Sequence, residues 1–181
     1  MTRKINNMAK TVKVKDVTLE WAKHLTEEGR DMGPEDDSDL GIKLKETQGQ
    51  YVVDIMINDE QKKQMVADGV PDKGLQAQLF KTRDTGEMFY KCRRPHFNPK
   101  FTDRATGEKG VVMGPPDIYM NERDDEGKLV RWNPEEHGLI GNGTTADVRF
   151  DVWNNSITRL DAILITDLVA YESDGSNEGE F

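Results

Sequence analysis

The stretch Ala146-Asp147-Val148-Arg149-Phe150-Asp151-Val152-Trp153 decides the class of fold that the sequence predicts. Its even-numbered residues are all apolar, while most of the intervening ones are charged, which is the pattern of a β-strand with one core face. Asn154-Asn155-Ser156 then predicts a turn, and Leu160 to Tyr171 predicts a second strand. The apolar run Ala162-Ile163-Leu164-Ile165 indicates burial on both faces of that strand, as in a small closed barrel.

Two more strands are predicted upstream. Residues 12–21 form the first, with a bulge near Lys15-Asp16, where the apolar positions shift register. The alternative for part of this segment is a short helix over Thr18 to Glu28, whose apolar residues also fall at helical spacing, and the first interpretation of Trp21 is core packing. Residues 50–58 alternate most clearly and predict a half-buried strand.

Local signals then predict a helix and a hairpin. Asn58 can cap a helix over Asp59 to Asp68, Gln61 completes a capping box, and Gly69 is placed to end the helix. Asp84-Thr85-Gly86 predicts a turn. Residues 78–83 and 87–93 are therefore expected to pair as a hairpin.

The middle of the chain is predicted to be irregular. Pro95 and Pro99 are expected to stop pairing, which leaves a loop over His96 to Lys109 with a turn at 105–107. Short strands are predicted over 111–113, 118–120 and 129–132. Many short strands with one inserted helix predict a mainly β fold, a small Greek-key barrel of the OB type, rather than βαβ alternation.

The totals predict one domain in a chain of 181 residues. We expect a flexible N-terminal arm over 1–10, the domain over 11–171, and a disordered acidic tail over 172–181. No apolar run approaches the roughly 20 residues of a membrane span, and the N-terminus lacks the apolar stretch of a signal peptide. Cys92 is the only cysteine. A reducing cytoplasm is therefore the expected setting.

The net charge of −9 argues at first against a nucleic-acid partner, because negative charge repels phosphate. The acids are gathered, however. Residues 27–39, predicted to be an acidic loop, carry −6, residues 122–126 carry −3, and residues 172–181 carry −4. Subtracting these 13 negative charges leaves the rest of the chain at +4.

One stretch combines cations with aromatic rings. Residues 89–101 hold four Lys or Arg, four Phe or Tyr, and no carboxylate. Rings that stack on unpaired bases, between cations that hold phosphates, are typical of single-strand binding. The ordinary alternative is a strand with core aromatics and a solvated charged face. Candidates for stacking are Tyr90, Phe97 and Trp153, then Trp132 and Phe101; candidates for phosphate contact are Lys91, Arg93, Arg94, Lys100 and Arg149, supported by Lys81 and Arg83.

Neither a metal site nor a catalytic site is expected. Cys92 and His96 lie four residues apart, but the other histidines are distant and no cysteine pair exists for zinc. Asp147 and Asp151 on one strand, with Asp161 and Asp167 on the next, make a weak case for a two-metal nuclease, although Arg149 and solvent exposure explain them better. No phosphate-binding loop or nucleophile elbow is present. We therefore expect no enzyme and no cofactor.

Three segments resemble the single-stranded DNA-binding proteins of tailed bacteriophages. They are 139–144 leading into the strand 146–153, the closing strand 164–171, and the end Glu178-Gly179-Glu180-Phe181. The resemblance implies an OB-fold that coats and protects single-stranded DNA in replication, recombination and repair, in the bacterial host cytoplasm. It also implies an acidic tail that competes with DNA and recruits a phage DNA polymerase or other replication proteins; the tail residues are Glu172, Asp174, Glu178, Glu180 and Phe181.

Exchange of this tail between two copies would give a homodimer. The second hypothesis is an OB-like protein interaction module, such as an acidic DNA mimic, that binds no nucleic acid. The acidic loop over 27–39 has no counterpart in the resemblance and leaves the size of the DNA footprint open. Salt-dependent binding to single strands separates the two hypotheses.

Overall fold

The computed structural model describes residues 9–34, 38–74, 79–153 and 157–170. The predicted turn at 154–156 and the acidic tail lie outside these ranges. The described strands are β1 (Ala9–His24), β2 (Gln50–Ile57), β3 (Phe80–Thr82), β4 (Met88–Pro95), β5 (Phe97–Thr102), β6 (Lys109–Val112), β7 (Asp117–Arg123), β8 (Leu129–Arg131), β9 (Thr144–Trp153) and β10 (Ile157–Asp167), and the helices are α1 (Asp39–Glu46), α2 (Asp59–Ala67) and α3 (Pro134–His137).

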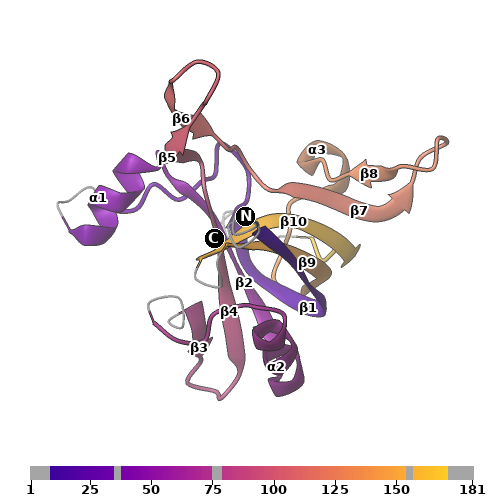
Figure 1. Cartoon of the computed structure of the whole chain (residues 1–181). Helices are drawn as coiled ribbons and strands as arrows, with labels where there is room; N and C mark the ends of the chain where they lie inside the picture. The colour runs from indigo at the N-terminus through magenta and orange to yellow at the C-terminus, as the bar shows by residue number, and fades with distance from the viewer. Residues whose placement is uncertain (1–8, 35–37, 75–78, 154–156, 171–181) are drawn as a thin grey trace, which may run out of the picture.

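Eight strands form one sheet in the order β3-β4-β2-β1-β9-β10-β7-β8, and β5 pairs with β6 in a separate hairpin (Figure 1). The sheet curls until β4 meets β10. The hydroxyl of Tyr90 on β4 lies 2.7 Å from Oγ1 of Thr158 on β10, and Arg94 donates to the carbonyl of Leu160 at 3.2 Å. The strands β4, β2, β1, β9 and β10 thereby close a small barrel, which confirms the predicted mainly β fold of OB type.

The core lies inside this barrel. On β9 the residues Ala146, Val148, Phe150 and Val152 are all buried, which confirms the predicted core face. On β10 the pairing with β9 shifts register between Leu160 and Ala162. The extra residue at this shift is Asp161, and beyond it Ala162 pairs with the outward-facing Arg149 while Ile163 pairs with the buried Val148. Ala162 and Ile163 therefore lie on opposite faces of β10, and both are buried, as the apolar run predicts. Leu164 is only half-buried, so the cover of the outer face is partial.

β1 is the longest strand and differs from the prediction at both ends. It begins at Ala9, so residues 9 and 10 belong to the sheet rather than to an arm. The bulge near Asp16 is confirmed, with φ of +57° and a register shift between Val14 and Val17. The strand continues to His24, which rules out the helix over 18–28. Trp21 is 58% exposed, so the core interpretation of this residue is wrong.

The capped helix and the first hairpin are confirmed. The Asn58 side chain accepts from the Gln61 backbone N–H at 2.8 Å, and the Gln61 side chain accepts from the Asn58 backbone N–H at 2.8 Å. β3 and β4 pair around the predicted turn. β2 matches the predicted strand, but Val52 and Asp54 on its second face are 6% exposed, so both faces of β2 are covered.

The prediction of an irregular loop over 96–109 is wrong, because β5 and β6 pair as a hairpin there. Their pairing is irregular between Asn98 and Thr102, and Pro99 falls in this irregular part, where it blocks no ladder hydrogen bond. The turn at 105–107 is present, with Gly107 at φ of +76°. Also unpredicted is α1, which follows the acidic loop.

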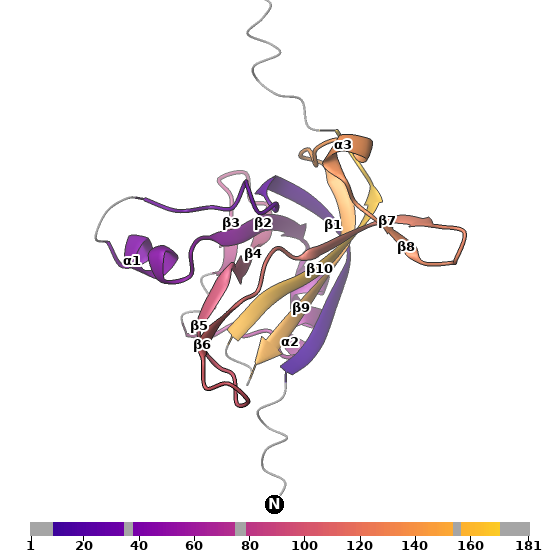
Figure 2. The ribbon, with the colours of Figure 1, turned by 90° about the horizontal axis from the view of Figure 1, so that it is seen from above.

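The β7–β8 hairpin leaves the barrel on the side away from α1 (Figure 2). β7 runs parallel to β10, with Ile118 opposite Ile163. Among the described residues, no helix is long and apolar enough to cross a membrane.

Candidate nucleic-acid interface

A groove of about 510 Å³ runs along the outer surface where β4 and β10 meet. We call it the β4–β10 groove. α1 and the chain leading into β2 form one wall, and β5 forms the other. In barrels of this type, the second and third strands and the loop after the first strand carry the usual oligonucleotide site. The lining residues are Ile42, Glu46, Thr47, Gln50, Arg93, Pro95, Phe97, Asn98, Pro99, Lys100, Ile157, Thr158 and Arg159.

Three cations line the groove against a single acid, Glu46. The guanidinium groups of Arg93 and Arg159 form no hydrogen bond or ion pair with any residue that the structure describes. Burial lowers the pKa of both guanidinium groups, and for Arg159 the nearby charge of Arg94 lowers it further. Both groups remain charged at neutral pH because the ordinary pKa of a guanidinium group lies far above 7. A partly desolvated guanidinium that no carboxylate contacts directly is well suited to hold phosphate oxygens, although the charge of Asp151 raises the pKa of Arg159 and opposes the other two effects.

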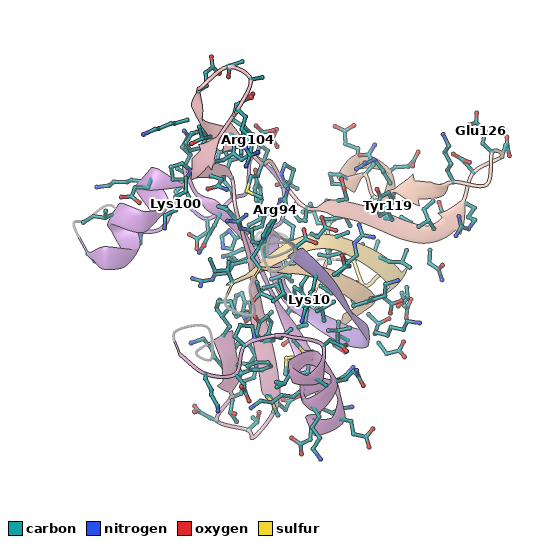
Figure 3. The ribbon with its side chains drawn as sticks, viewed as in Figure 1. Lys10, Arg94, Lys100, Arg104, Tyr119 and Glu126 are labelled. Atoms are coloured by element: carbon teal, nitrogen blue, oxygen red, sulfur yellow. The ribbon has the colours of Figure 1, made fainter. Side chains whose placement is uncertain are left out.

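Lys100 extends from β5 beside α1 (Figure 3). It is exposed and therefore reaches solvent at the outer wall of the groove. A lysine on a flexible stem can follow a backbone phosphate without fixing its orientation.

The apolar part of the groove consists of Phe97 and two isoleucines. Ile42 and Ile157 are each 45% exposed, which is unusual for side chains of this size in a groove that solvent enters. Phe97 is half-buried, and its ring covers Gly110, where an added Cβ would collide with the ring. The Phe97 backbone N–H donates to the Thr47 carbonyl at 2.9 Å, which ties β5 to the opposite wall. These surfaces can accept the flat faces of unpaired bases.

Arg94, by contrast, belongs to the scaffold. Its guanidinium donates to the carbonyls of Gly114 at 2.8 Å, Met113 at 3.0 Å and Leu160 at 3.2 Å. Three charge-assisted hydrogen bonds fix this side chain where β4, the chain before β7 and β10 converge. The structure therefore does not place Arg94 among the cations that line the β4–β10 groove. The alternation along β4 explains the contrast, because Arg93 and Arg94 point to opposite faces.

Two predicted stacking residues also prove to be structural. Tyr90 is 0% exposed, packs edge-on against Phe150, and has a raised pKa because it is buried. Trp132 packs against the core, and its indole N–H donates to the Gly138 carbonyl at 2.9 Å. Tyr90 therefore presents no free face to a base, and the partly buried Trp132 does not line the β4–β10 groove.

Three further candidate cations are held by carboxylates. Arg83 lies 2.6 Å from Glu20, Lys91 lies 3.4 Å from Asp54, and Arg149 lies 2.6 Å from Asp161. Phosphate would have to compete with these partners. Lys81, Phe101 and Trp153 have substantial exposed surface, but none of them lines the β4–β10 groove.

The structure thus brings together Arg93, Phe97 and Lys100 of the predicted set and adds Arg159 and Ile157, which the sequence analysis missed. Their signal is the alternation in which Thr158 and Leu160 are buried and Ile157 and Arg159 face outward. Cys92 is buried, and the buried His96 accepts or donates through Nδ1 to the Tyr51 hydroxyl at 2.6 Å. In the described part of the chain, no group of three or more His, Cys, Asp or Glu side chains could hold a metal ion.

No protein-family model and no curated protein matches the chain. Among solved structures, it is similar to gp2.5, a single-stranded DNA binding protein encoded by bacteriophage T7, at 16% identity and a TM-score of 0.52, covering 95% of this chain and 94% of the T7 chain. A C-terminally truncated single-stranded DNA-binding protein from bacteriophage Enc34 matches at 12% identity and a TM-score of 0.47, covering 90% and 87%. The T7 likeness shows that the two chains share a fold.

Proposed function

We propose that the protein binds single-stranded DNA without catalysing a reaction and that the β4–β10 groove holds the strand. The observation that carries the proposal is the combination in one groove of Arg93, Lys100 and Arg159 with the ring of Phe97 and exposed isoleucines. Cations for the backbone and apolar surfaces for the bases are what a sequence-tolerant strand requires. The T7 protein of the same fold is named for this activity, which adds support by analogy.

The electrostatics of the groove set the expected salt dependence. Each phosphate neutralised on a single strand contributes roughly −0.7 to the log–log slope of affinity against salt, so three cations give about −2. Lys91 would add roughly −0.7 to this slope if a phosphate of the DNA displaced it from Asp54. One or two bases stacked on Phe97 and its apolar neighbours would contribute about 1 to 3 kcal/mol each. The strand would then be held by both terms together.

The acidic tail supports a regulatory role within the same proposal. Its acids resemble a string of phosphates, and Phe181 could occupy the place of a base. A tethered tail acts at an effective concentration on the order of mM, so a weak contact is sufficient to compete with DNA. We propose that DNA releases this tail for replication proteins and that the protein coats single strands during phage replication, recombination and repair in the host cytoplasm.

The experiment is a fluorescence-anisotropy titration of labelled oligothymidine at several salt concentrations. We compare the full chain, a chain ending at Tyr171, and the double variant Arg93→Ala/Arg159→Ala. We expect tighter binding without the tail and at least tenfold weaker binding by the double variant, with a shallower salt slope. Lys63→Ala/Lys128→Ala removes two exposed cations far from the groove and should bind as the parent does.

The outcome also separates the proposal from its competitor. The net charge of −9 favours a protein interaction module or DNA mimic. Absence of binding by the full and shortened chains at low salt would refute single-strand binding and leave that module. Equal losses in the groove variant and the control variant would refute the groove as the site.

A further inference from the structure

Trp21 is an exposed tryptophan on the outer surface of the barrel. It is 58% exposed and lies within β1, whereas Leu19 and Ala22, which lie close to it on the same strand, are buried. A large aromatic ring in solvent loses the stabilisation that burial would give it. No part of the groove described above includes this residue.

The backbone of β1 is distorted to present this ring. The pairing between β1 and β2 shifts register between Glu20 and His24, and Trp21 has φ of +57°. A bulky residue at positive φ is a genuine outlier, and bulges commonly redirect a side chain near a functional site. The Asn142 side chain accepts from the Trp21 backbone N–H at 2.9 Å and holds the distortion in place.

The ring lies beside a second groove that continues from the first. This groove, of about 350 Å³, is lined by Trp21, Lys23 and Lys91 together with the carboxylates Asp31 and Asp54. The two grooves adjoin across the sheet. Val52 of the second groove stands directly opposite Arg93 of the first on β4 and opposite His24 on β1. Paired residues of antiparallel strands face the same side, so these three side chains form one row on the outer face of the sheet, in which Val52 is only 6% exposed between its two neighbours.

We propose that Trp21 stacks on a base of the single strand that leaves the β4–β10 groove across β2. This inference rests on the proposed function and extends its footprint. The row from Arg93 to His24 spans about 10 Å, two strand spacings, and Trp21 lies three residues before His24 on β1, within the second groove. Lys23, whose Nζ lies 5.9 Å from the centre of the Trp21 ring, flanks the second groove and can meet a phosphate beside a stacked base. Lys91 is paired with Asp54, and the carboxylates Asp31 and Asp54 favour bases rather than phosphates along the rest of this groove.

The test uses the full chain and oligothymidines of increasing length. Trp21→Ala should leave affinity for the shortest oligomers unchanged and weaken binding of the longer ones by about 5- to 150-fold, the range that corresponds to loss of one stacked base. Trp21→Phe keeps a ring and should retain most of the affinity. DNA should quench tryptophan emission in the parent chain, and Trp21→Phe should lose most of that quenching. Leu139→Ala, which shortens another exposed apolar side chain, is the matched control.

The results distinguish this inference from the proposed function. If Trp21→Ala binds every length as the parent chain does while Arg93→Ala/Arg159→Ala weakens binding, the second contact is refuted and the first groove stands. If the parent chain binds no oligomer at low salt, both fail. The circular dichroism spectrum of Trp21→Ala must match that of the parent chain for its affinity to be interpreted. If Trp21→Ala does not fold, Trp21→Phe decides: loss of the DNA-induced quenching in this folded variant supports the contact, and unchanged quenching refutes it.

Discussion

The Tyr90 hydroxyl lies 2.7 Å from Oγ1 of Thr158 and joins β4 to β10 inside the barrel. The same Thr158 also lines the β4–β10 groove, so this contact links closure of the barrel, to which the hydrogen bond from Arg94 to Leu160 also contributes, with the shape of the groove. The Tyr90 ring packs against Phe80 and Phe150, with centroid distances of 4.6 Å and 5.6 Å.

Tyr90→Phe tests this structural role. The ring contacts remain while the buried hydrogen bond is lost, so we expect the free energy of unfolding to fall by about 0.5 to 1.5 kcal/mol. Urea denaturation followed by circular dichroism measures the change. The affinity for oligothymidine should stay within twofold of the parent chain. A large loss of DNA affinity at unchanged stability would instead show that the Tyr90 hydroxyl contributes to DNA binding.

Arg93 and Arg94 are adjacent and should respond oppositely to alanine. Arg94→Ala removes the guanidinium that donates to three carbonyls and should lower the free energy of unfolding by on the order of 2 to 4 kcal/mol, with an unchanged salt slope in the folded protein. Arg93→Ala should change stability by less than about 1 kcal/mol and reduce the magnitude of the salt slope by roughly 0.7.

Urea denaturation and anisotropy titrations of both variants measure these changes. Arg93→Lys is the control, because it keeps the charge and should keep the slope. A reversed pattern, in which Arg94→Ala flattens the slope and Arg93→Ala unfolds the protein, would contradict the assignment of the groove.

Arg93 and Arg94 also show which features the sequence predicts and which ones it cannot predict. The alternation on β9 and the capping box at Asn58 are local signals, and both were predicted correctly because neighbouring residues determine them. Part of the cluster over 89–101 lines the β4–β10 groove, and its role in binding DNA stays a prediction. Which of its cations face the groove depends on where β10 meets β4, a contact between residues 66 positions apart. Arg159 could have been predicted from alternation with Leu160.

Trp21 and Pro99 were misinterpreted for different physical reasons. Exposure of Trp21 depends on a positive φ that Asn142, 121 positions away, stabilises. Sequence periodicity assumes a regular backbone and therefore cannot indicate it. Pro99 usually breaks a strand, but here it occupies the irregular part of the β5–β6 pairing, where no hydrogen bond is required of it.

Asp54 predicts a pH dependence of stability. It is 6% exposed, its Oδ1 has no hydrogen bond, and burial raises its pKa above 3.8; the charge of Glu20 adds to this effect, whereas Lys91 and Arg83 oppose it. The folded state therefore binds the proton more readily than the unfolded state. Between the raised pKa of the folded state and the ordinary value of 3.8, the contribution of Asp54 to the free energy of unfolding increases as pH falls and decreases as pH rises.

Asp54→Asn should remove that dependence. Its free energy of unfolding relative to the parent chain should be most favourable at pH 7 and should decline as pH approaches about 4. Urea denaturation across this range measures the difference, and Asp125→Asn at the exposed hairpin tip controls for the change in net charge. A difference that grows as pH falls would contradict the sign.

Gly110 should control the position of Phe97. Gly110 has φ of +90°, and an added Cβ would collide with the Phe97 ring, so Gly110→Ala combines backbone strain with displacement of the ring. Gly107 in the same hairpin has φ of +76° and nothing within 4 Å of an added Cβ, so Gly107→Ala carries strain alone. Each variant should lose about 1 to 2 kcal/mol of stability from the backbone.

Only Gly110→Ala should also weaken binding of oligothymidine, by about fivefold or more, because the groove loses the surface on which a base stacks. Anisotropy titration of both variants beside the parent chain measures this difference. Equal affinity of the two alanine variants would show that Phe97 supports the hairpin without contacting DNA. The apolar contribution in the β4–β10 groove would then have to come from Ile42 on α1 and Ile157 on β10, which are both exposed.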